Sequence, residues 1–350
     1  MEIGGDFWLD NISYNNDCNK EFFDMGKDHY FVMSGRTAID VVIQDIIKEK
    51  KVRNVYFPSY SCESMQEPFI DRNIKIDFYN VYFDNTLKYD IDLEHECDIF
   101  FAMNYFGYTS TNMESYIKEF KKKNVIVIED ITHSLLSDKI FSKYSDYLVC
   151  SLRKWFPIIC GGLVAKINGN FNINFDSFTL NKEVIDNKKM AMQIKELAVK
   201  ANDFGQNKEE YLHLYKKANS AIKLDYINKK IDDNSLKYLL NVDLKEVRKK
   251  RQQNVDVIYK NIKDMSYSLL IDSYDRKNDC LLYVPIYVDK ATLIKIKEKI
   301  YLDKFYCPSH WPIDSQINDL YEHELSIVCD QRYTKEQIEK KCNKQKMEVL

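Results

Sequence analysis

Lys154 is the residue of this sequence whose neighbours point most clearly to chemistry. It lies in SLRKWFPIICGG (151–162), directly after the apolar run YLVC (147–150). An amine forms imines with carbonyl groups, and burial beside other cations lowers its pKa and frees its lone pair. Arg153 and Arg36 could supply such cations. The pattern predicts that Lys154 holds a carbonyl cofactor as a Schiff base; the alternative is an ordinary exposed lysine.

Ser151 and Lys154 also match the SxxK nucleophile pattern of penicillin-recognising enzymes. That pattern needs both side chains on one helical turn, whereas Ser151 follows an apolar strand and Pro157 prevents a helix from continuing. The S-D-N and K-T-G signatures of those enzymes do not occur in the sequence. We therefore favour imine chemistry for Lys154.

Asp130 ends the apolar run VIVIED (125–130), which places a carboxylate at the mouth of the predicted sheet. A carboxylate there could pair with a protonated ring nitrogen. A pyridinium ring withdraws electrons from a carbanion, which is the electron-sink chemistry of pyridoxal 5'-phosphate (PLP). His133 is placed to touch the same ring from its face or edge. The alternatives are a helix N-cap for Asp130 and a satisfied, partly buried histidine for His133.

The segment MSGRT (33–37) precedes a predicted helix and is a candidate phosphate site. The free N–H groups and the positive end of a helix start favour an anion, and hydroxyl and guanidinium groups add ligands. The alternative is an ordinary helix cap. The sequence contains no G-x-G-x-x-G and no G-x-x-x-x-G-K-[ST], so it supports neither a dinucleotide fold nor a P-loop.

The elements that would position these residues alternate along the first half of the chain. Hydrophobic periodicity predicts helices at 36–50, 61–73 and 112–123, and strands at 54–58, 74–81, 98–108, 125–130, 147–152 and 161–167. This alternation indicates an α/β fold with a largely parallel sheet and helices on both faces. Ligands bind beyond the carboxyl ends of the strands in such sheets, and the candidate residues lie at predicted strand ends.

The second half is predicted to build a smaller unit. A polar helical stretch covers 181–225, and an amphipathic helix at 244–265 would bridge into the second domain. After it come a strand at 280–288, a helix at 290–302, an extended segment at 304–306 and a final helix from Thr334. We expect a large domain over 1–240 and a small C-terminal α+β domain over 241–350.

Composition excludes several classes of protein. The 350 residues carry 51 basic and 54 acidic side chains, a net charge of -3, so no field would attract nucleic acid. The longest uncharged stretches, 99–113 and 155–165, are shorter than the roughly 18 residues of a membrane span, and the acidic start lacks a signal-peptide pattern. We expect a soluble, cytoplasmic protein. Nine scattered cysteines without a CxxC pair predict reduced thiols and no metal site.

The order and spacing of these motifs resemble the DegT/DnrJ/StrS family of PLP-dependent sugar aminotransferases, of fold type I. The likeness covers most of the chain. It is carried by the turn near Gly35, PSYSC (58–62), the Asp130-x-x-His133 pair, Lys154 with its following glycines, and the segments 248–259, 305–312 and 325–340, the last resembling the family's closing helix signature.

This resemblance implies roles for individual residues. Lys154 would hold PLP as an internal aldimine and move the proton between substrate and cofactor. The implied cofactor-binding residues are Gly35, Arg36, Thr37 and Ser151 around the phosphate, Asp130 at the pyridine nitrogen, His133 at the ring or its 3-hydroxyl, and Cys62 against the ring. His310 and Trp311 are the implied substrate-binding residues. Residues 181–225 differ from the family pattern, and none of them is assigned a role.

The implied activity is transfer of an amino group from glutamate to a keto-sugar, linked to a nucleotide, for a surface glycan or a secondary metabolite. A homodimer with two-fold symmetry is expected. Two alternatives stay open. One is a PLP-dependent sugar dehydratase, although such relatives carry histidine at the lysine position. The other is a catalytically inactive PLP-fold protein that binds or regulates.

Overall fold

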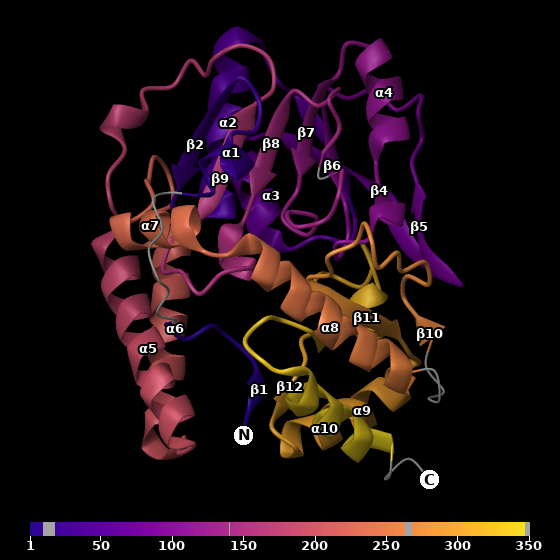
Figure 1. Ribbon diagram of the computed structural model, residues 1–350. Helices are drawn as coiled ribbons and strands as arrows, with labels where there is room; N and C mark the ends of the chain where they lie inside the picture. Colours follow the sequence, from indigo (N-terminus) through magenta and orange to yellow (C-terminus); the bar gives the residue numbers. More distant parts are fainter. Residues whose placement is uncertain (10–17, 140, 263–267, 347–350) are drawn as a thin grey trace.

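The computed structural model describes residues 1–9, 18–139, 141–262 and 268–346. Its main feature is an eight-stranded sheet with the order β2-β9-β8-β7-β6-β3-β4-β5 (Figure 1). The strands are β2 (Asp28–Val32), β3 (Asn54–Pro58), β4 (Lys75–Asp84), β5 (Thr86–Asp90), β6 (Ile99–Met103), β7 (Ile126–Asp130), β8 (Tyr147–Cys150) and β9 (Gly162–Lys166). The four central pairings, from β4 through β3, β6 and β7 to β8, are parallel. The predicted largely parallel sheet is confirmed.

The helices of the first half bury apolar side chains, and three of them, α2, α3 and α4, pack on this sheet. They are α1 (Lys20–Phe23), α2 (Gly35–Glu49), α3 (Glu63–Ile70) and α4 (Glu114–Lys122). Helix α2 buries Ile39, Ile43 and Ile46 at helical spacing and packs on β8 and β9. Helix α3 is shorter than predicted. It begins after Cys62, and the chain leaves the helical conformation before Asn73, which has a positive φ of 55°.

Strand β6 is also shorter than the predicted segment 98–108. It ends at Met103, and Phe106 and Gly107 follow with positive φ values of 55° and 91°. Left-handed backbone breaks a strand, so the chain turns at this point. The turn directs the backbone N–H of Phe106 to the loop after β7, where it donates a hydrogen bond to Nδ1 of His133.

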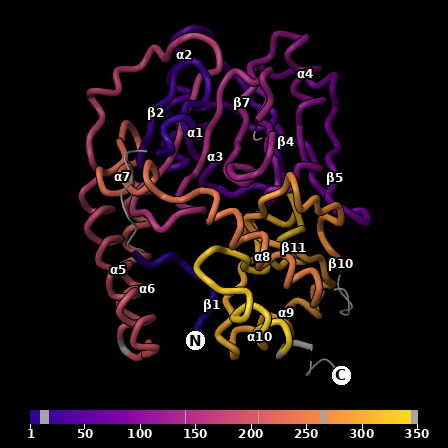
Figure 2. Tube along the Cα trace, in the orientation of Figure 1, coloured from indigo at the N-terminus to yellow at the C-terminus, as the bar shows by residue number. Residues whose placement is uncertain are grey.

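The polar stretch predicted to be helical at 181–225 forms a helical hairpin. Helices α5 (Lys182–Ala201) and α6 (Gly205–Leu224) lie side by side, as Figures 1 and 2 both show. The hairpin packs on the large unit through buried residues such as Val184 and Met192. Two lysines of α5, Lys188 and Lys195, are buried as well. Helix α7 (Asp233–Asn241) follows.

The last third of the chain builds the second unit around a small sheet of order β10-β11-β13. Its elements are α8 (Leu244–Ile262), β10 (Ser268–Leu269), β11 (Tyr283–Tyr287), α9 (Lys290–Leu302), β12 (Phe305–Tyr306), β13 (Glu324–Val328) and α10 (Lys335–Lys346). Helix α8 runs from the large sheet to this unit, and the predicted helix end at 263–265 lies outside the described residues (Figure 1). The first part of the 325–340 motif is a strand, and only its second part is helical.

The N-terminal residues join the second unit. Strand β1 (Ile3–Gly4) pairs in parallel with β12, and Figure 2 shows the start of the trace among the C-terminal elements. We propose a large domain over 1–240 and a small domain over 241–350, with this segment crossing between them. Within the described ranges, none of the helices combines the length and the apolar character that crossing a membrane requires.

Candidate active site

Asp130 and Lys154 meet at one edge of the large sheet. Strands β7 and β8 are parallel neighbours, and Asp130, the last residue of β7, is in register with Val149. Strand β8 ends at Cys150, Ser151 follows, and Lys154 is the last residue of the short 3-10 helix (Leu152–Lys154) that begins there. Parallel strands place their carboxyl ends together, so both side chains line one cavity of about 280 Å³.

Residues from the starts of α2 and α3 complete the lining of this smaller cavity. Six of the ten predicted site residues line it, namely Gly35, Arg36, Cys62, Asp130, Ser151 and Lys154. Thr37 does not. It is buried, and its hydroxyl donates to the carbonyl oxygen of Tyr226 at 3.0 Å. The predicted role of Thr37 at a phosphate stays a prediction.

Two glycines allow the start of α2 to approach the strand ends. A Cβ atom on Gly162 would lie 2.2 Å from the carbonyl oxygen of Ser34, and one on Gly35 would lie 2.9 Å from Cβ of Ser151. Larger residues would therefore push this turn away from the sheet. The close packing brings the free N–H groups of a helix start to the wall of the cavity.

Arg36 adds positive charge beside this helix start. Its Nη2 forms an ion pair with Glu67 at 2.7 Å. Its Nη1 is buried and has no hydrogen-bond partner among the described residues. A buried donor without a partner is unfavourable, so this atom is suited to an anionic ligand.

The carboxylate of Asp130 is held in place by the loop that follows it. Its Oδ1 accepts a hydrogen bond from the backbone N–H of Thr132 at 2.7 Å. Residues 132–136 form turns, so no helix follows and the N-cap alternative for Asp130 is wrong. Burial raises the pKa of Asp130, while Thr132 and the nearby Lys154 act in the opposite direction. The carboxylate therefore lacks a strong cationic partner.

Thr132 is a residue of this site that the sequence analysis missed. Its hydroxyl oxygen accepts from the backbone N–H of Ser151 at 2.9 Å, and its carbonyl oxygen accepts from Nε1 of Trp155 at 2.5 Å. These bonds tie the loop after β7 to the loop that carries Lys154. The only signal in the sequence was the position of Thr132 between Asp130 and His133.

His133 is fully buried next to Lys154. Its Nδ1 accepts the backbone N–H of Phe106 at 3.1 Å, so the neutral ring carries its hydrogen on Nε2. Burial, together with Lys154 and His310, keeps the pKa of His133 well below its usual range. Nε2 lies 3.4 Å from Nζ of Lys154. Because Nε2 donates, this hydrogen bond requires the uncharged amine, which is the form that attacks a carbonyl.

Two residues of the C-terminal unit cover this pair. The ring of Trp311 stacks on His133 at a centroid distance of 5.5 Å, and Nζ of Lys154 lies 5.3 Å from the centroid of Trp311. His310 contacts Trp311, and its Nδ1 lies 3.0 Å from Oγ of Ser326. Trp311 therefore reaches Lys154 from the opposite unit, but neither it nor His310 lines the smaller cavity.

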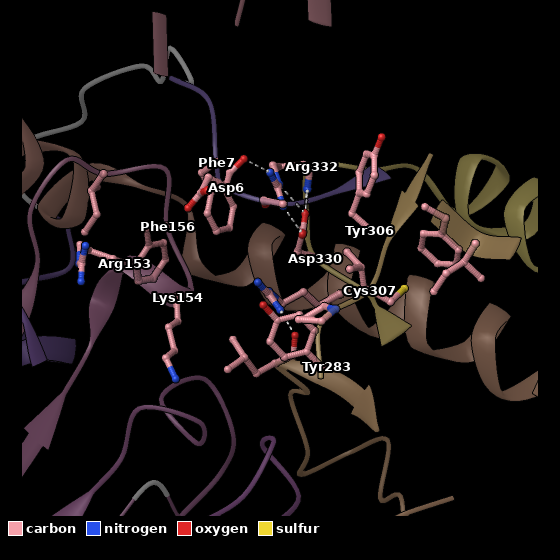
Figure 3. A pocket seen from close by; sticks show the side chains of 18 of the residues that line it. Asp6, Phe7, Arg153, Lys154, Phe156, Tyr283, Tyr306, Cys307, Asp330 and Arg332 are labelled. Carbon is pink, nitrogen blue, oxygen red and sulfur yellow. Dashed lines mark hydrogen bonds and ion pairs between the residues drawn. The ribbon is translucent and has the colours of Figure 1, made fainter. Parts of the chain in front are cut away.

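A second, larger cavity of about 580 Å³ adjoins the first. Arg153 and Lys154 line both, so the two cavities meet at these residues. Figure 3 shows Arg153 and Lys154 on one side of the larger cavity and Tyr283, Asp330 and Arg332 on the other. The larger volume lies within the range of cavities that hold small-molecule ligands. A cofactor-sized space thus adjoins a substrate-sized space, with Lys154 between them.

Comparison with known proteins identifies the fold. No protein-family model and no curated protein matches the sequence. Among solved structures, the chain is similar to PseC of Helicobacter pylori, an aminotransferase in the biosynthesis of pseudoaminic acid, with TM-score 0.64, 14% identity and 98% of each chain covered. It is also similar to the aminotransferase TlmJ of Streptoalloteichus hindustanus, with TM-score 0.63, 10% identity and coverage of 98% of this chain and 92% of that one.

A third similar structure is E. coli GDP-4-keto-6-deoxy-D-mannose-3-dehydratase with bound hydrated PLP. Its TM-score is 0.61 at 13% identity, over 92% of this chain and 88% of the dehydratase. At such low identities the likeness establishes the fold and leaves the reaction open. The chain therefore has the α/β fold that these aminotransferases share with the PLP-containing dehydratase, which confirms the predicted fold class.

Proposed function

We propose that this chain is a PLP-dependent aminotransferase of the DegT/DnrJ/StrS type. It would move an amino group from glutamate to a nucleotide-linked keto-sugar for a surface glycan or a secondary metabolite. The observation that carries the proposal is the cavity shared by Lys154 and Asp130 at neighbouring strand ends. The similar folds of PseC and TlmJ support amino transfer, and the similar dehydratase supports the cofactor.

The residues of the smaller cavity fit PLP. Gly35, Arg36 and Ser151 would hold its phosphate, for which the unpartnered Nη1 of Arg36 is suited. Asp130 would accept a hydrogen bond from the protonated ring nitrogen. That ring would supply the cation that this buried carboxylate lacks. Cys62 would lie against the ring. When bound, PLP supplies a carbonyl carbon for amines and an electron-withdrawing ring.

The chain's own side chains would bind the cofactor and move protons. The hydrogen bond from Nε2 of His133 favours the uncharged amine of Lys154, which can bond to the cofactor's carbonyl carbon. With PLP and substrate bound, Nζ of Lys154 would take the proton from the amino-bearing carbon of the substrate and deliver it to the carbon that was the cofactor's carbonyl carbon. Trp311 covers Lys154 and His133 and would exclude water.

The overall reaction balances without a further reagent. Glutamate gives its amino group and leaves as 2-oxoglutarate, and the keto carbon of the sugar takes the amino group in place of its oxygen. A homodimer and a cytoplasmic location belong to the same proposal. The substrate roles of His310 and Trp311 also stay predictions, supported by the contacts of Trp311 with the Lys154 and His133 side chains.

Lys154→Ala tests the proposal directly. The wild-type protein loaded with PLP should show the visible absorbance of a lysine-bound cofactor, and borohydride should fix the cofactor on the peptide that contains Lys154. Lys154→Ala should lose both signals, whereas Lys189→Ala, at an exposed position of α5, should keep them. Unchanged visible absorbance in Lys154→Ala would refute the assignment.

Substrate addition separates the alternatives. With glutamate, an aminotransferase should lose the visible absorbance and release 2-oxoglutarate, whereas an inactive binding protein should show neither change. With a panel of keto-sugar nucleotides, the mass of the product distinguishes the gain of an amine from the loss of oxygen. Oxygen loss without amine gain would favour the dehydratase.

A further inference from the structure

Two cations of the larger cavity lack the partners that buried charges normally have. Nε of Arg153 is buried and has no hydrogen-bond partner among the described residues. Lys188, on α5, is only 9% exposed, and within the described part of the chain neither an ion pair nor a hydrogen bond engages its Nζ. The two side chains are near enough that Arg153 helps to lower the pKa of Lys188, after burial, to about 7.

The surrounding acids offset the charge of this pair only in part: Asp6 and Asp232 raise the pKa of Lys188, but less than burial and Arg153 lower it. Asp232 uses one carboxylate oxygen to accept the backbone N–H of Ser235 and the other to accept that of Cys160. Burial raises the pKa of the Cys160 thiol to about 12, so the thiol is neutral. Asp6 is exposed, and its side chain forms no ion pair with any residue that the structure describes. Among the described residues, no acid therefore forms a direct ion pair with Arg153 or Lys188, and their positive charge at the cavity is only partly offset.

Three other buried cations, Arg332, Arg251 and Lys195, are held by protein groups. Arg332 forms a two-pronged ion pair with Asp330, at 2.9 and 2.7 Å. Arg251 donates to the carbonyl oxygens of Leu281 and Leu282, and Lys195 donates to that of Asp6. Because an unpaired buried charge is unfavourable, the contrast indicates that Arg153 and Lys188 are kept for a ligand.

We propose that Arg153 and Lys188 bind an oxyanion of a substrate in the larger cavity, next to Lys154. This inference rests on the proposed function, because amino transfer brings two substrates to the same lysine. The shared chemistry is a carboxylate or a phosphate, which Arg binds through a planar fork and Lys as a point charge. Glutamate would present a carboxylate, and a nucleotide-linked sugar would present a diphosphate.

Calorimetric titration of the PLP-loaded protein tests this inference without turnover. The two probes are glutarate, a dicarboxylate that has no amino group, and inorganic pyrophosphate. The variants are Lys188→Met and Arg153→Met, and Lys189→Met is the control because Lys189 is the exposed neighbour on the same helix. Loss of one charged hydrogen bond should weaken binding by about tenfold to a hundredfold.

We expect the wild type and Lys189→Met to bind one probe alike, and Lys188→Met and Arg153→Met to bind it more weakly. Weaker glutarate binding identifies the carboxylate of the amino donor, and weaker pyrophosphate binding identifies the phosphates of the sugar nucleotide. The inference is overturned if the wild type binds neither anion, or if both variants bind as the wild type does. The visible absorbance reports separately on PLP, so failure of the proposed function would be distinguishable.

Discussion

Lys188→Met should stabilise the protein when no anionic ligand is present. The side chain keeps its length and apolar stem, and the substitution removes a buried charge that no described residue pairs. The pKa of Lys188 falls from 10.5 to about 7 in the folded protein. Each pKa unit corresponds to about 1.4 kcal/mol, so the burial penalty approaches roughly 5 kcal/mol as an upper figure. We expect a gain in unfolding free energy of about 2–5 kcal/mol at pH 6.

The pH dependence of this gain has a definite sign. Above about pH 10.5 the lysine is neutral in both the folded and the unfolded chain, so its charge carries no penalty. Between about 10.5 and 7 the unfolded chain binds a proton that the folded chain lacks, and wild-type stability falls as the pH falls. Below pH 7 both states are protonated and the penalty is constant. The advantage of Lys188→Met should therefore grow from pH 10 to pH 7 and then level off.

Urea denaturation at pH 6, 8 and 9.5, with Lys189→Met as control, measures this gain. Arg153, Asp6, Cys160 and Asp232 are the charged or titratable groups near Lys188, and all of them are unchanged in the variant. If Lys188→Met lost stability, or if its gain were the same at all three pH values, the account of a buried charge that is only partly offset would be wrong. Adding the anion that wild type binds should narrow the gap, because the ligand stabilises wild type more than the variant that binds it more weakly.

Two further substitutions test the geometry of the smaller cavity. Gly162→Ala should cost about 1–3 kcal/mol of unfolding free energy and weaken PLP binding, because the new Cβ would lie 2.2 Å from the carbonyl oxygen of Ser34. Gly205→Ala, whose Cβ would meet only Oδ1 of Asp203 at 3.3 Å, should neither lower the unfolding free energy in urea denaturation nor weaken binding in PLP titration. Asp130→Asn should keep the visible absorbance but lower the rate of amino transfer at least a hundredfold, since the buried ring cation loses its partner; a wild-type rate would exclude that pairing.

Hydrophobic pattern predicted the centre of the large sheet well because β3, β6, β7, β8 and β9 are buried runs bounded by polar residues. Strand β3 matches the predicted segment 54–58, and β7 differs from 125–130 by one residue. The ends of elements were less predictable where single residues decide them. The turn at Phe106 and Gly107 depends on backbone conformation that no periodic pattern reports. Strand β5 was missed although its partner β4 precedes it directly, because the turn between them depends on the positive φ of Asn85. The strand part of the 325–340 motif was missed because its partner β11 lies elsewhere in the chain.

The rule that ligands bind at strand ends predicted Asp130 and Lys154 at the centre of the site, but not Lys188 in the larger cavity. Asp130 and Lys154 follow neighbouring parallel strands, so sheet topology alone brings them together. Lys188 could not be found in this way. It stands in a helix rich in polar residues, where the exposed Lys189 looks the same in sequence. Only the packing of the α5–α6 hairpin on the large unit decides which of these lysines is buried.

Strand β1 connects the N-terminal end of the chain to the C-terminal unit. The backbone N–H of Gly4 donates to the hydroxyl of Tyr333, across 329 residues of sequence, and Gly5, Asp6 and Phe7 then continue into the wall of the larger cavity. Contacts of such long sequence separation form late in folding, because the loop they close is long. During synthesis, the wall of the larger cavity would thus remain incomplete until the C-terminal unit has emerged from the ribosome, so premature termination would leave even an intact large sheet without this cavity.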